Sequence, residues 1–337
     1  MYARIRPWLF RLDAEHAHRV TLWLLRVAAS VPPGRAILRR AYADGLPASP
    51  VDILGLHFRN PVGLAAGYDK EGRTVRGLAC LGFGHLEIGT VTVRAQRGNP
   101  RPRLFRLPED EGLINRMGFP NPGMSAVLVR LRQPRSPGVI VGVNIGKGKD
   151  TPLQDAGHDY AELVRGLGAR ADYITVNISS PNTLGLRDLQ ARASLERLLT
   201  NLRRVRGEGA RRVPLLVKLA PDLEPAGLTE ALDVIEATGM DGVIAVNTTL
   251  ARPELRSAHA MEGGGLSGRP LFLRALHVVE AIARRTQGRL PIVAVGGIDG
   301  VEPARAMRQA GASLIQIYTG LVYAGPGLVR EIVRGLR

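Results

Sequence analysis

The sequence predicts an α/β protein, a (β/α)8 TIM barrel with an N-terminal helical hairpin extension. From residue 60 onward, short apolar runs rich in valine and isoleucine alternate with helix-like segments. These runs do not alternate apolar with polar residues, which is typical of parallel strands covered on both faces. Eight such units over about 250 residues match the count and size of a barrel. A doubly wound open sheet is the alternative.

Each predicted strand ends at a polar or glycine cluster. The strands are expected at residues 62–66, 85–91, 139–145, 173–178, 215–219, 242–246, 291–295 and 313–317. Helices are expected between them, among others at residues 195–206, 227–238, 271–285 and 303–310.

Residues 1–42 are predicted to form an amphipathic helical hairpin, followed by a barrel domain at residues 43–337. The first 40 residues hold eight arginines and both tryptophans, Trp8 and Trp23. Two short helices are expected, the second over about residues 14–29 and stopped by Pro32-Pro33-Gly34. The hairpin either docks on the barrel as an ordinary amphipathic pair or lies in a membrane interface.

The same segment is a poor candidate for a membrane span or a signal peptide. Arg19 and Arg26 interrupt the run of ~20 apolar residues that a span needs. Asp13 and Glu15 stand where the apolar core of a signal peptide would begin.

The composition excludes several classes of protein. Cys80 is the only cysteine, so a disulfide scaffold or a cysteine-rich metal site is excluded. The net charge of +16 suits nucleic acid, an anionic membrane or an anionic small molecule. Aromatic residues make up 4% of the chain and the arginines are dispersed, which disfavours nucleic acid.

Catalytic groups of such barrels come from the C-terminal ends of the strands. These ends carry amides, hydroxyls, glycines and lysines, with neither histidine nor paired carboxylates, so we expect no metal site. Amide and ammonium groups suit a planar, anionic, hydrogen-bonding ligand, and the glycines after the last two strands suit a phosphate. The residues concerned are 66–70, Thr90, Asn144, Asn177, Lys218, Asn247, Thr248, Gly296, Gly297, Tyr318, Thr319 and Gly320.

The stretch 176–183, Val-Asn-Ile-Ser-Ser-Pro-Asn-Thr, places polar residues directly after a buried strand. Ser180 is a candidate base or nucleophile, but no histidine lies nearby in the sequence to activate it. The alternative is an ordinary hydroxyl-capped turn that leads into the next helix.

Six runs spread over most of the chain resemble the dihydroorotate dehydrogenase family, in that family's order. They are residues 65–70 (Ala-Ala-Gly-Tyr-Asp-Lys), 115–119 (Asn-Arg-Met-Gly-Phe), 144–147 (Asn-Ile-Gly-Lys), 176–183, 247–249 (Asn-Thr-Thr) and 264–268 (Gly-Gly-Leu-Ser-Gly). Ser180 stands where class 1 enzymes carry cysteine, and the N-terminal extension is present. Both features resemble class 2, the quinone-dependent and membrane-associated branch.

The resemblance implies FMN as the cofactor and dihydroorotate as the substrate. FMN is expected at Ala66, Gly67, Tyr68, Asp69, Lys70, Thr90, Asn144, Asn177, Lys218, Val246, Gly268, Gly297, Tyr318 and Thr319. Dihydroorotate is expected at Lys70, Asn115, Arg116, Met117, Gly118, Phe119, Asn177, Asn182, Asn247 and Thr248. Val246 and Thr319 depart from the family's more common threonine and serine.

The implied reaction oxidises dihydroorotate to orotate in pyrimidine biosynthesis, with Ser180 as general base. It removes a proton from C5 and a hydride from C6, so the developing enolate needs positive charge and hydrogen-bond donors. Lys70 and the asparagine amides can supply them, and Lys218 can stabilise reduced flavin. A serine needs help to lose its proton, for which Thr183 is a hypothesis.

By the same resemblance, the hairpin forms a tunnel that admits a membrane quinone to the flavin edge. His18 and Arg106 are expected near the quinone ring, and Leu9, Leu22 and Leu25 along the tunnel wall. The arginines would favour anionic lipid headgroups, each by ~1 kcal/mol. A monomer at the cytoplasmic face of a bacterial inner membrane, peripherally attached, is the expected setting.

Three rival interpretations remain at this point. One is a class 1 enzyme or a dihydropyrimidine dehydrogenase module, against which Ser180, the N-terminal extension and the lack of iron–sulfur cysteines argue. Another is a non-redox, phosphate-binding barrel such as an aldolase or synthase, which would be colourless. The third, a nucleic-acid binder, is disfavoured by the composition.

Overall fold

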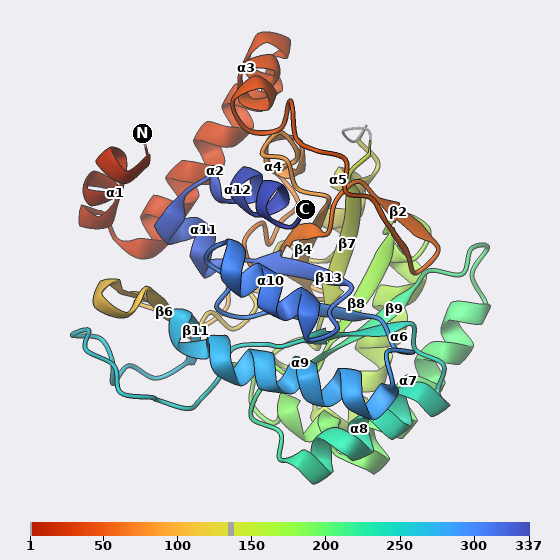
Figure 1. Cartoon of the computed structure of the whole chain (residues 1–337). Helices are drawn as coiled ribbons and strands as arrows, with labels where there is room; N and C mark the ends of the chain where they lie inside the picture. The colour runs from red at the N-terminus through yellow and green to blue at the C-terminus, as the bar shows by residue number, and fades with distance from the viewer. Residues whose placement is uncertain (1, 134–137) are drawn as a thin grey trace.

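The computed structural model describes residues 2–133 and 138–337, and its centre is a closed barrel of eight parallel strands (Figure 1). The strands follow one another around the barrel in the order β10-β12-β13-β3-β4-β7-β8-β9. The predicted (β/α)8 barrel is confirmed, and the open sheet is excluded. The barrel strands are β3 (Val62–Leu64), β4 (His85–Val91), β7 (Ile140–Ile145), β8 (Tyr173–Asn177), β9 (Leu215–Leu219), β10 (Gly242–Ala245), β12 (Ile292–Val295) and β13 (Leu314–Ile317).

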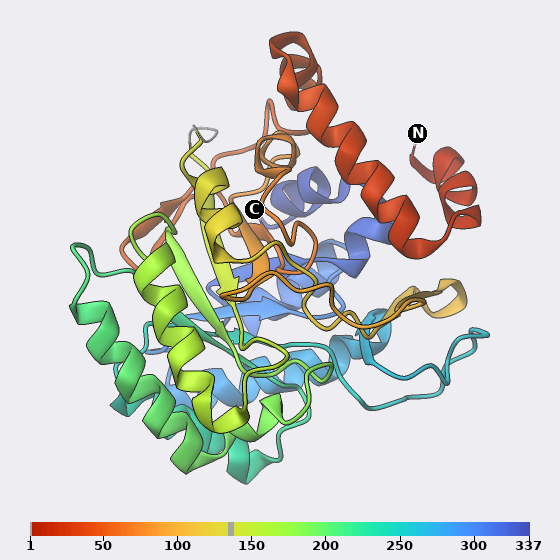
Figure 2. The same ribbon diagram turned by 180° about the vertical axis from the view of Figure 1, so that it is seen from behind.

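Helices surround the barrel and cover the outer face of its strands (Figure 2). Every position of β4, β8 and β9 is buried, which explains why these strands appear in the sequence as unbroken apolar runs. The helices are α4 (Val75–Ala79), α5 (Met124–Leu131), α6 (Ala156–Leu167), α7 (Arg192–Gly207), α8 (Pro225–Ala237), α9 (Phe272–Thr286), α10 (Val301–Gln309), α11 (Thr319–Ala324) and α12 (Leu328–Gly335).

The N-terminal region forms three helices, so the two-helix hairpin predicted from the sequence is wrong in number. They are α1 (Tyr2–Arg11), α2 (Ala14–Ser30) and α3 (Pro32–Tyr42). Pro32 and Pro33 end α2 as expected, but they also occupy the first turn of α3. A proline there costs no hydrogen bond, because the first N–H groups of a helix have no partner within it.

The helix α2 is attached to the barrel by a close helix contact and an ion cluster. A Cβ atom at Gly77 of α4 would lie 2.7 Å from Leu25 Cγ and 2.8 Å from Leu25 O, so α4 can approach α2 because it carries glycine there. Near the start of α2, Glu15 accepts hydrogen bonds from the guanidinium groups of Arg101 and Arg103, at 2.8–3.1 Å.

Two small antiparallel sheets were not anticipated from the sequence. The hairpin of β1 (Val51–Ile53) and β2 (Leu56–Phe58) places Phe58 against the barrel residues Tyr173 and Leu216. The second sheet joins β5 (Leu104–Leu107), β6 (Gly112–Asn115) and β11 (Gly265–Gly268). It carries the run 115–119 toward the strand ends of the barrel.

Within residues 2–133 and 138–337, every helix falls short of the length and apolarity that a membrane span needs.

Candidate active site

A cavity of about 990 Å³ lies where the C-terminal ends of the strands meet. The structure brings together here most of the residues that the sequence singled out. The predicted residues that line it are Ala66, Gly67, Lys70, Thr90, Asn115, Met117, Gly118, Phe119, Asn177, Ser180, Asn182, Lys218, Val246, Asn247, Thr248, Gly268, Gly296, Gly297, Tyr318, Thr319 and Gly320.

Four predicted residues lie outside this lining. Asn144 is fully buried directly behind Asn177, to which it is hydrogen-bonded. Asp69 is buried and accepts hydrogen bonds from the backbone of residues 73 and 74, so it shapes the loop after β3. Tyr68 lines a different cavity, described below, and Arg116 forms an ion pair with Glu262.

Glycines shape the part of the cavity formed after β12 and β13. Gly296 and Gly297 both have positive φ, at 138° and 69°, and a Cβ at Gly297 would collide with Phe272 at 2.5 Å. Only glycine therefore fits this turn. Nearby, Ser267 and Thr319 share a hydrogen bond of 2.9 Å between their hydroxyl groups. Backbone N–H groups and hydroxyls of this kind form a cradle that suits a phosphate.

Lys218, at the C-terminal part of β9, is a buried cation that faces the cavity. Its residue is only 6% exposed, and the described residues give its ammonium group no hydrogen-bond partner. Burial lowers the pKa of Lys218, while the carboxylate of Glu87 raises it. A buried ammonium group without a hydrogen-bond partner is costly, so a ligand with carbonyl or anionic atoms fits above it.

A second lysine, Lys70, lies at the opposite wall of the cavity. Its ammonium group donates to the carbonyl of Gly67. Burial is the main reason why the pKa of Lys70 falls to about 8, and Arg103 lowers it further, against the carboxylates of Glu15 and Asp69. Lys70 therefore keeps its positive charge near neutral pH and can hold an anionic ligand.

Three asparagines and a threonine form a hydrogen-bonded layer at the ends of β4, β7, β8 and β10. Asn144 Oδ1 accepts from Thr90 Oγ1 at 2.6 Å and from Asn177 Nδ2 at 3.0 Å. Asn177 Oδ1 in turn accepts from Asn247 Nδ2 at 3.2 Å. Each amide is held by its neighbour, so the layer presents fixed donors and acceptors to a ligand.

Ser180 lies in the loop after β8 and lines the same cavity. Its residue is 5% exposed, and its hydroxyl oxygen accepts from the backbone N–H of Asn182 at 3.3 Å. Asn182 Nδ2 donates to Asn115 Oδ1 at 3.1 Å, which connects this loop to β6. The described contacts include no hydrogen bond between Ser180 and Thr183, so the suggested relay has no direct contact here.

The sequence reasoning missed several residues of this site. Ser267 and Gln316 line the cavity, and Glu87 lies in the barrel beneath it. Gln316 and Glu87 stand out in the sequence as polar residues inside apolar strand runs, and this signal could have found them. Ser267 lies within the run 264–268 that resembles the family, and that run is the signal that could have found it.

A second, mostly apolar cavity of about 1610 Å³ runs between the N-terminal helices and the barrel. Tyr318 lines both cavities, so the two meet at that side chain. Leu9, Leu22 and Leu25, predicted as wall residues, line it together with His18 and Arg106.

Two polar side chains, His18 and Arg106, stand out in its mostly apolar lining. His18 Nε2 lies 2.8 Å from the carbonyl oxygen of Tyr68, so this nitrogen carries the hydrogen and donates. Burial, and then the positive charge of Lys70, lower the pKa of His18 to about 3. The imidazole is therefore neutral near pH 7. Arg106 donates to the carbonyl of Leu12 at 2.7 Å and lies over the ring of Phe10.

The fold and these cavities define a class of protein: a (β/α)8-barrel enzyme with an amide-lined, cationic site at the strand ends and a separate apolar entrance. Among the described residues, no three His, Cys, Asp or Glu side chains are grouped so as to hold a metal ion.

Comparisons with known proteins place the chain within one family. A family model described as dihydroorotate dehydrogenase matches residues 49–337. A dihydroorotate dehydrogenase (quinone) of Roseiflexus sp. (strain RS-1) is 54% identical over 100% of this chain and 93% of its own. One of Methylococcus capsulatus (strain ATCC 33009 / NCIMB 11132 / Bath) with the same name is 49% identical over 98% of this chain and 97% of its own.

A solved structure agrees with the same assignment. The crystal structure of a DHODH from Eimeria tenella in complex with ferulenol has a TM-score of 0.89 and 38% identity, covering 96% of this chain and 90% of that one. The chain belongs to the dihydroorotate dehydrogenase family, in its quinone-dependent class. The resemblance drawn from the motifs is thereby confirmed.

Proposed function

We propose that the chain oxidises dihydroorotate to orotate at the strand-end cavity, with FMN as cofactor, and passes the electrons to a quinone. The family and the quinone-dependent relatives support the overall reaction. Within the structure, the observation that carries most weight is Lys218: a buried ammonium without a hydrogen-bond partner among the described residues, which faces a cavity shaped by glycines at its other end. This arrangement fits a flat, polar ring system attached to a phosphate.

The residues present fit FMN in both charge and shape. Gly268, Gly297, Tyr318 and Thr319 would hold the phosphate, while Lys218 and Asn177 would hold the ring. FMN, when bound, supplies an acceptor for the hydride from C6 of dihydroorotate. Ala66, Gly67, Thr90 and Val246 complete the contacts from the cavity wall, and Asn144 acts from behind the wall through Asn177.

Dihydroorotate would lie between the ring site and the loop after β8. Lys70 neutralises its carboxylate, and Asn115, Asn182 and Asn247 offer amide groups to its carbonyl and N–H edges. Ser180 lies within this same lining and takes the C5 proton as general base. The positive charge of Lys70 and the amide donors stabilise the negative charge that develops on the substrate.

The apolar cavity would admit the quinone. Its wall is formed by helix α2 and the barrel, and it ends at Tyr318 beside the site of oxidation. Because His18 is neutral, it contributes a hydrogen-bonding group and no charge, while the Arg106 guanidinium supplies a positive charge in the same lining.

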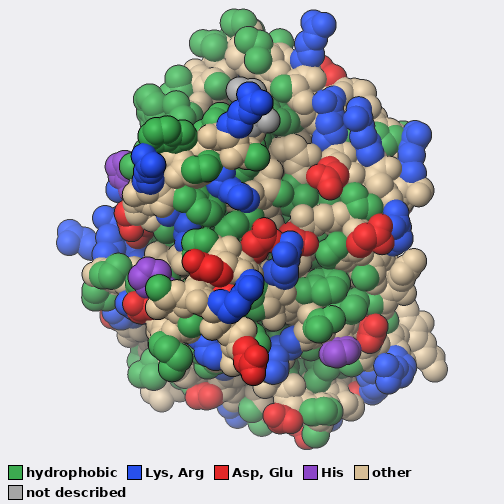
Figure 3. All heavy atoms as spheres, turned by 60° about the vertical axis from the view of Figure 1, so that its left-hand side comes forward, with side chains coloured by type: hydrophobic (Ala, Val, Ile, Leu, Met, Phe, Trp, Pro, Cys, Tyr) green, Lys and Arg blue, Asp and Glu red, His purple; other side chains and the backbone are tan. Residues whose placement is uncertain are grey.

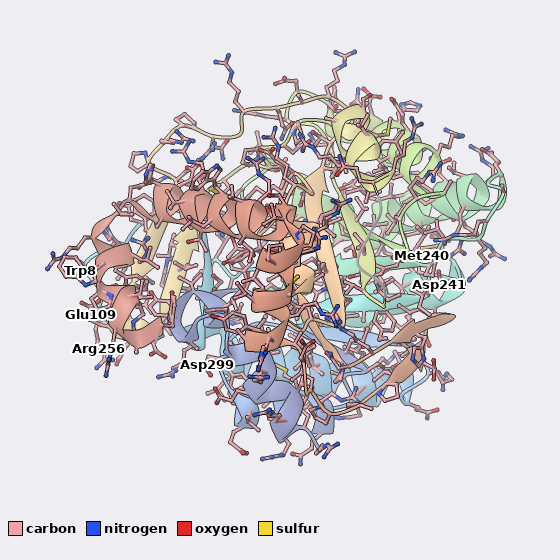
Figure 4. All side chains as sticks on the ribbon, turned by 90° about the horizontal axis from the view of Figure 1, so that it is seen from above. Trp8, Glu109, Met240, Asp241, Arg256 and Asp299 are labelled. Atoms are coloured by element: carbon pink, nitrogen blue, oxygen red, sulfur yellow. The ribbon has the colours of Figure 1, made fainter. Side chains whose placement is uncertain are left out.

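The N-terminal helices would attach the protein peripherally to the cytoplasmic face of the bacterial inner membrane. Eight of the exposed large apolar side chains among the described residues lie there: Ile5, Trp8, Leu12, Trp23, Leu24, Val27, Val31 and Ile37. Basic and apolar side chains are interspersed on this side of the molecule (Figure 3), which suits an anionic lipid surface. In Figure 4, Trp8 lies at the opposite side of the molecule from Asp241.

We further propose that residues 1–42 form the membrane-attachment module and residues 43–337 form the barrel domain. We also propose that the protein is a monomer.

The reductive half-reaction tests this function. Purified protein should release FMN on heating, and anaerobic dihydroorotate should bleach its visible flavin absorbance. Ser180→Ala should slow bleaching by at least about 100-fold with unchanged FMN content, because it removes the proton acceptor. Ser194→Ala, at a half-buried position in the first turn of α7 outside the cavity lining, is the matched control and should bleach at the normal rate. Normal bleaching by Ser180→Ala would remove that residue from the proposed role.

A further inference from the structure

Glu87 is an acidic residue buried in the middle of the barrel. It lies on β4 with a residue exposure of 1%, beneath the cavity and outside its lining. The proposed reaction makes no use of it. A buried carboxyl group is costly unless it is hydrogen-bonded, so its partners indicate what it does.

Three side chains donate hydrogen bonds to this carboxyl group. Asn144 Nδ2 donates to Oε1 at 2.8 Å, while Gln316 Nε2 and the Tyr173 hydroxyl donate to Oε2 at 2.9 Å and 3.1 Å. All three partners present hydrogens, and a carboxylate anion only accepts them. Both carboxyl oxygens of Glu87 therefore act as hydrogen-bond acceptors.

The carboxylate of Glu87 accepts hydrogen bonds but has no hydrogen to donate, and this fixes the orientation of the Asn144 amide. An amide can present either its oxygen or its NH2 group, and next to Glu87 only the NH2 group is acceptable. Asn144 Oδ1 then points toward Thr90 Oγ1 and Asn177 Nδ2, from which it accepts.

The same constraint passes on to the residues that face the ligands. Because Asn177 uses its NH2 group toward Asn144, its Oδ1 accepts from Asn247 Nδ2 at 3.2 Å. Asn247 Oδ1 accepts from the backbone N–H of Thr248. One carboxylate thus determines which end of each of three asparagines faces its neighbour, from β4 to the residues after β10.

Glu87 also acts on Lys218. Among the described residues, it is the only titratable or charged group found to act on the ammonium of that lysine, and it favours the protonated form. Tyr173 of β8 also faces the carboxylate but carries no charge near neutral pH, because burial keeps its pKa well above the ordinary value. The barrel interior therefore pairs one buried negative charge with one buried positive charge.

We propose that Glu87 is a positioning residue for the cofactor site, which orients the Asn144–Asn177–Asn247 amides and supplies the counter-charge for Lys218. This inference rests on the proposed function, since it takes FMN as the ligand. Glu87 touches neither ligand and acts through residues that do.

The test uses Glu87→Gln, a substitution of nearly the same shape. Glutamine has its own NH2 group, which can turn toward Asn144 Oδ1 and allow the amides to reverse, and it removes the charge. We expect FMN binding, measured by fluorescence titration, to weaken at least about tenfold. We also expect a new ionisation in the absorbance of the bound flavin as the pH is varied, which reports the loss of counter-charge at Lys218.

Two further variants separate these effects from simple damage to the barrel. Tyr173→Phe removes one hydrogen bond to the same carboxylate but leaves the charge and Asn144 in place. It should bind FMN within about twofold of the original chain and show no new ionisation. The double variant Glu87→Gln/Lys218→Met should lose the new ionisation, because the group that titrates has been removed.

The outcomes distinguish this inference from the function on which it rests. Original protein without FMN would overturn the proposed function. Original protein with FMN, together with Glu87→Gln that binds FMN within about twofold and shows no new ionisation, would overturn the role of Glu87 alone. If Glu87→Gln does not fold, the variant Glu87→Asp tests the role of Glu87 instead. It keeps the charge but is too short to reach Asn144 and Gln316 together, so weaker FMN binding without a new ionisation is expected, and unchanged binding would overturn the role.

Discussion

His85 is a single buried residue that affects how the stability of this fold depends on pH. It lies at the start of β4, fully buried, with the ring of Phe58 edge-on at 5.4 Å between centroids. Neither ring nitrogen has a hydrogen-bond partner among the described residues. Burial lowers the pKa of His85 to about 3, so the folded protein holds this imidazole neutral.

Replacing His85 by leucine should stabilise the protein and make it less sensitive to acid. Between about pH 6.5 and pH 3 the unfolded chain binds a proton at this residue and the folded chain does not, so stability falls as the pH falls through that range. His85→Leu should raise the free energy of unfolding by about 1 kcal/mol at pH 7, by removing two unpaired polar atoms.

Urea unfolding at pH 7 and pH 5 measures both effects. The increase in the free energy of unfolding that His85→Leu causes should be larger at pH 5 than at pH 7. His277→Leu, at an exposed position of α9, is the matched control and should leave the pH dependence unchanged. An acid sensitivity of His85→Leu equal to that of the original chain would contradict this explanation.

The residues at strand ends were predictable from the sequence, whereas the buried polar residues beneath them show in the sequence only as polar positions inside apolar runs, without the direction in which they face. Lys218, Asn177 and Asn247 follow apolar runs, and a barrel brings the ends of its strands to one face. Glu87 lies inside such a run, and only the register of the closed barrel decides that it faces inward. The sequence pattern alone does not contain that register.

At the scale of secondary structure, the contact between α2 and α4 determines the width of the apolar cavity. Leu25 lines that cavity from α2, and Gly77 of α4 lies directly against it. Any side chain at position 77 must push α2 away from the barrel, because the nearest atoms include the Leu25 backbone. The proposed quinone path is therefore sensitive to a residue that does not touch the strand-end cavity.

Gly77→Ala should impair the quinone reaction selectively. Displacing α2 should cost about 1–3 kcal/mol of stability and raise the KM for quinone several-fold. Anaerobic bleaching by dihydroorotate should keep its rate, since the strand-end cavity is unchanged. The matched control is Gly207→Ala at the end of α7, where an added Cβ has no neighbour within 4 Å. Equal loss in both half-reactions would show that α2 does not act on the quinone path alone.

The elements missed by the sequence analysis have a common physical cause. The strands β5, β6 and β11 have four residues each, and β11 pairs with β6 across about 150 residues of chain. Short strands with glycine at their ends carry little local signal, and their pairing depends on long-range packing. The third helix is absent from the sequence prediction because Pro32 and Pro33 indicate the end of a helix, although proline also suits the first turn of the next one.

At the scale of the whole molecule, two cavities of opposite character meet at one side chain. The strand-end cavity is lined by lysines, amides and glycines, and the cavity under the N-terminal helices is mostly apolar. Tyr318 lines both. An anionic substrate and a hydrophobic electron acceptor can thus approach the same centre from two sides without exchanging places.

The most direct test of this account is re-oxidation of the reduced protein in an anaerobic stopped-flow experiment. Protein bleached by one equivalent of dihydroorotate is mixed with a short-chain quinone and, in separate runs, with fumarate or NAD. We predict that the flavin absorbance returns rapidly with quinone and stays bleached with the other two. A protein that shows no flavin absorbance, or one whose bleached flavin is re-oxidised by fumarate or NAD but not by quinone, would contradict the account.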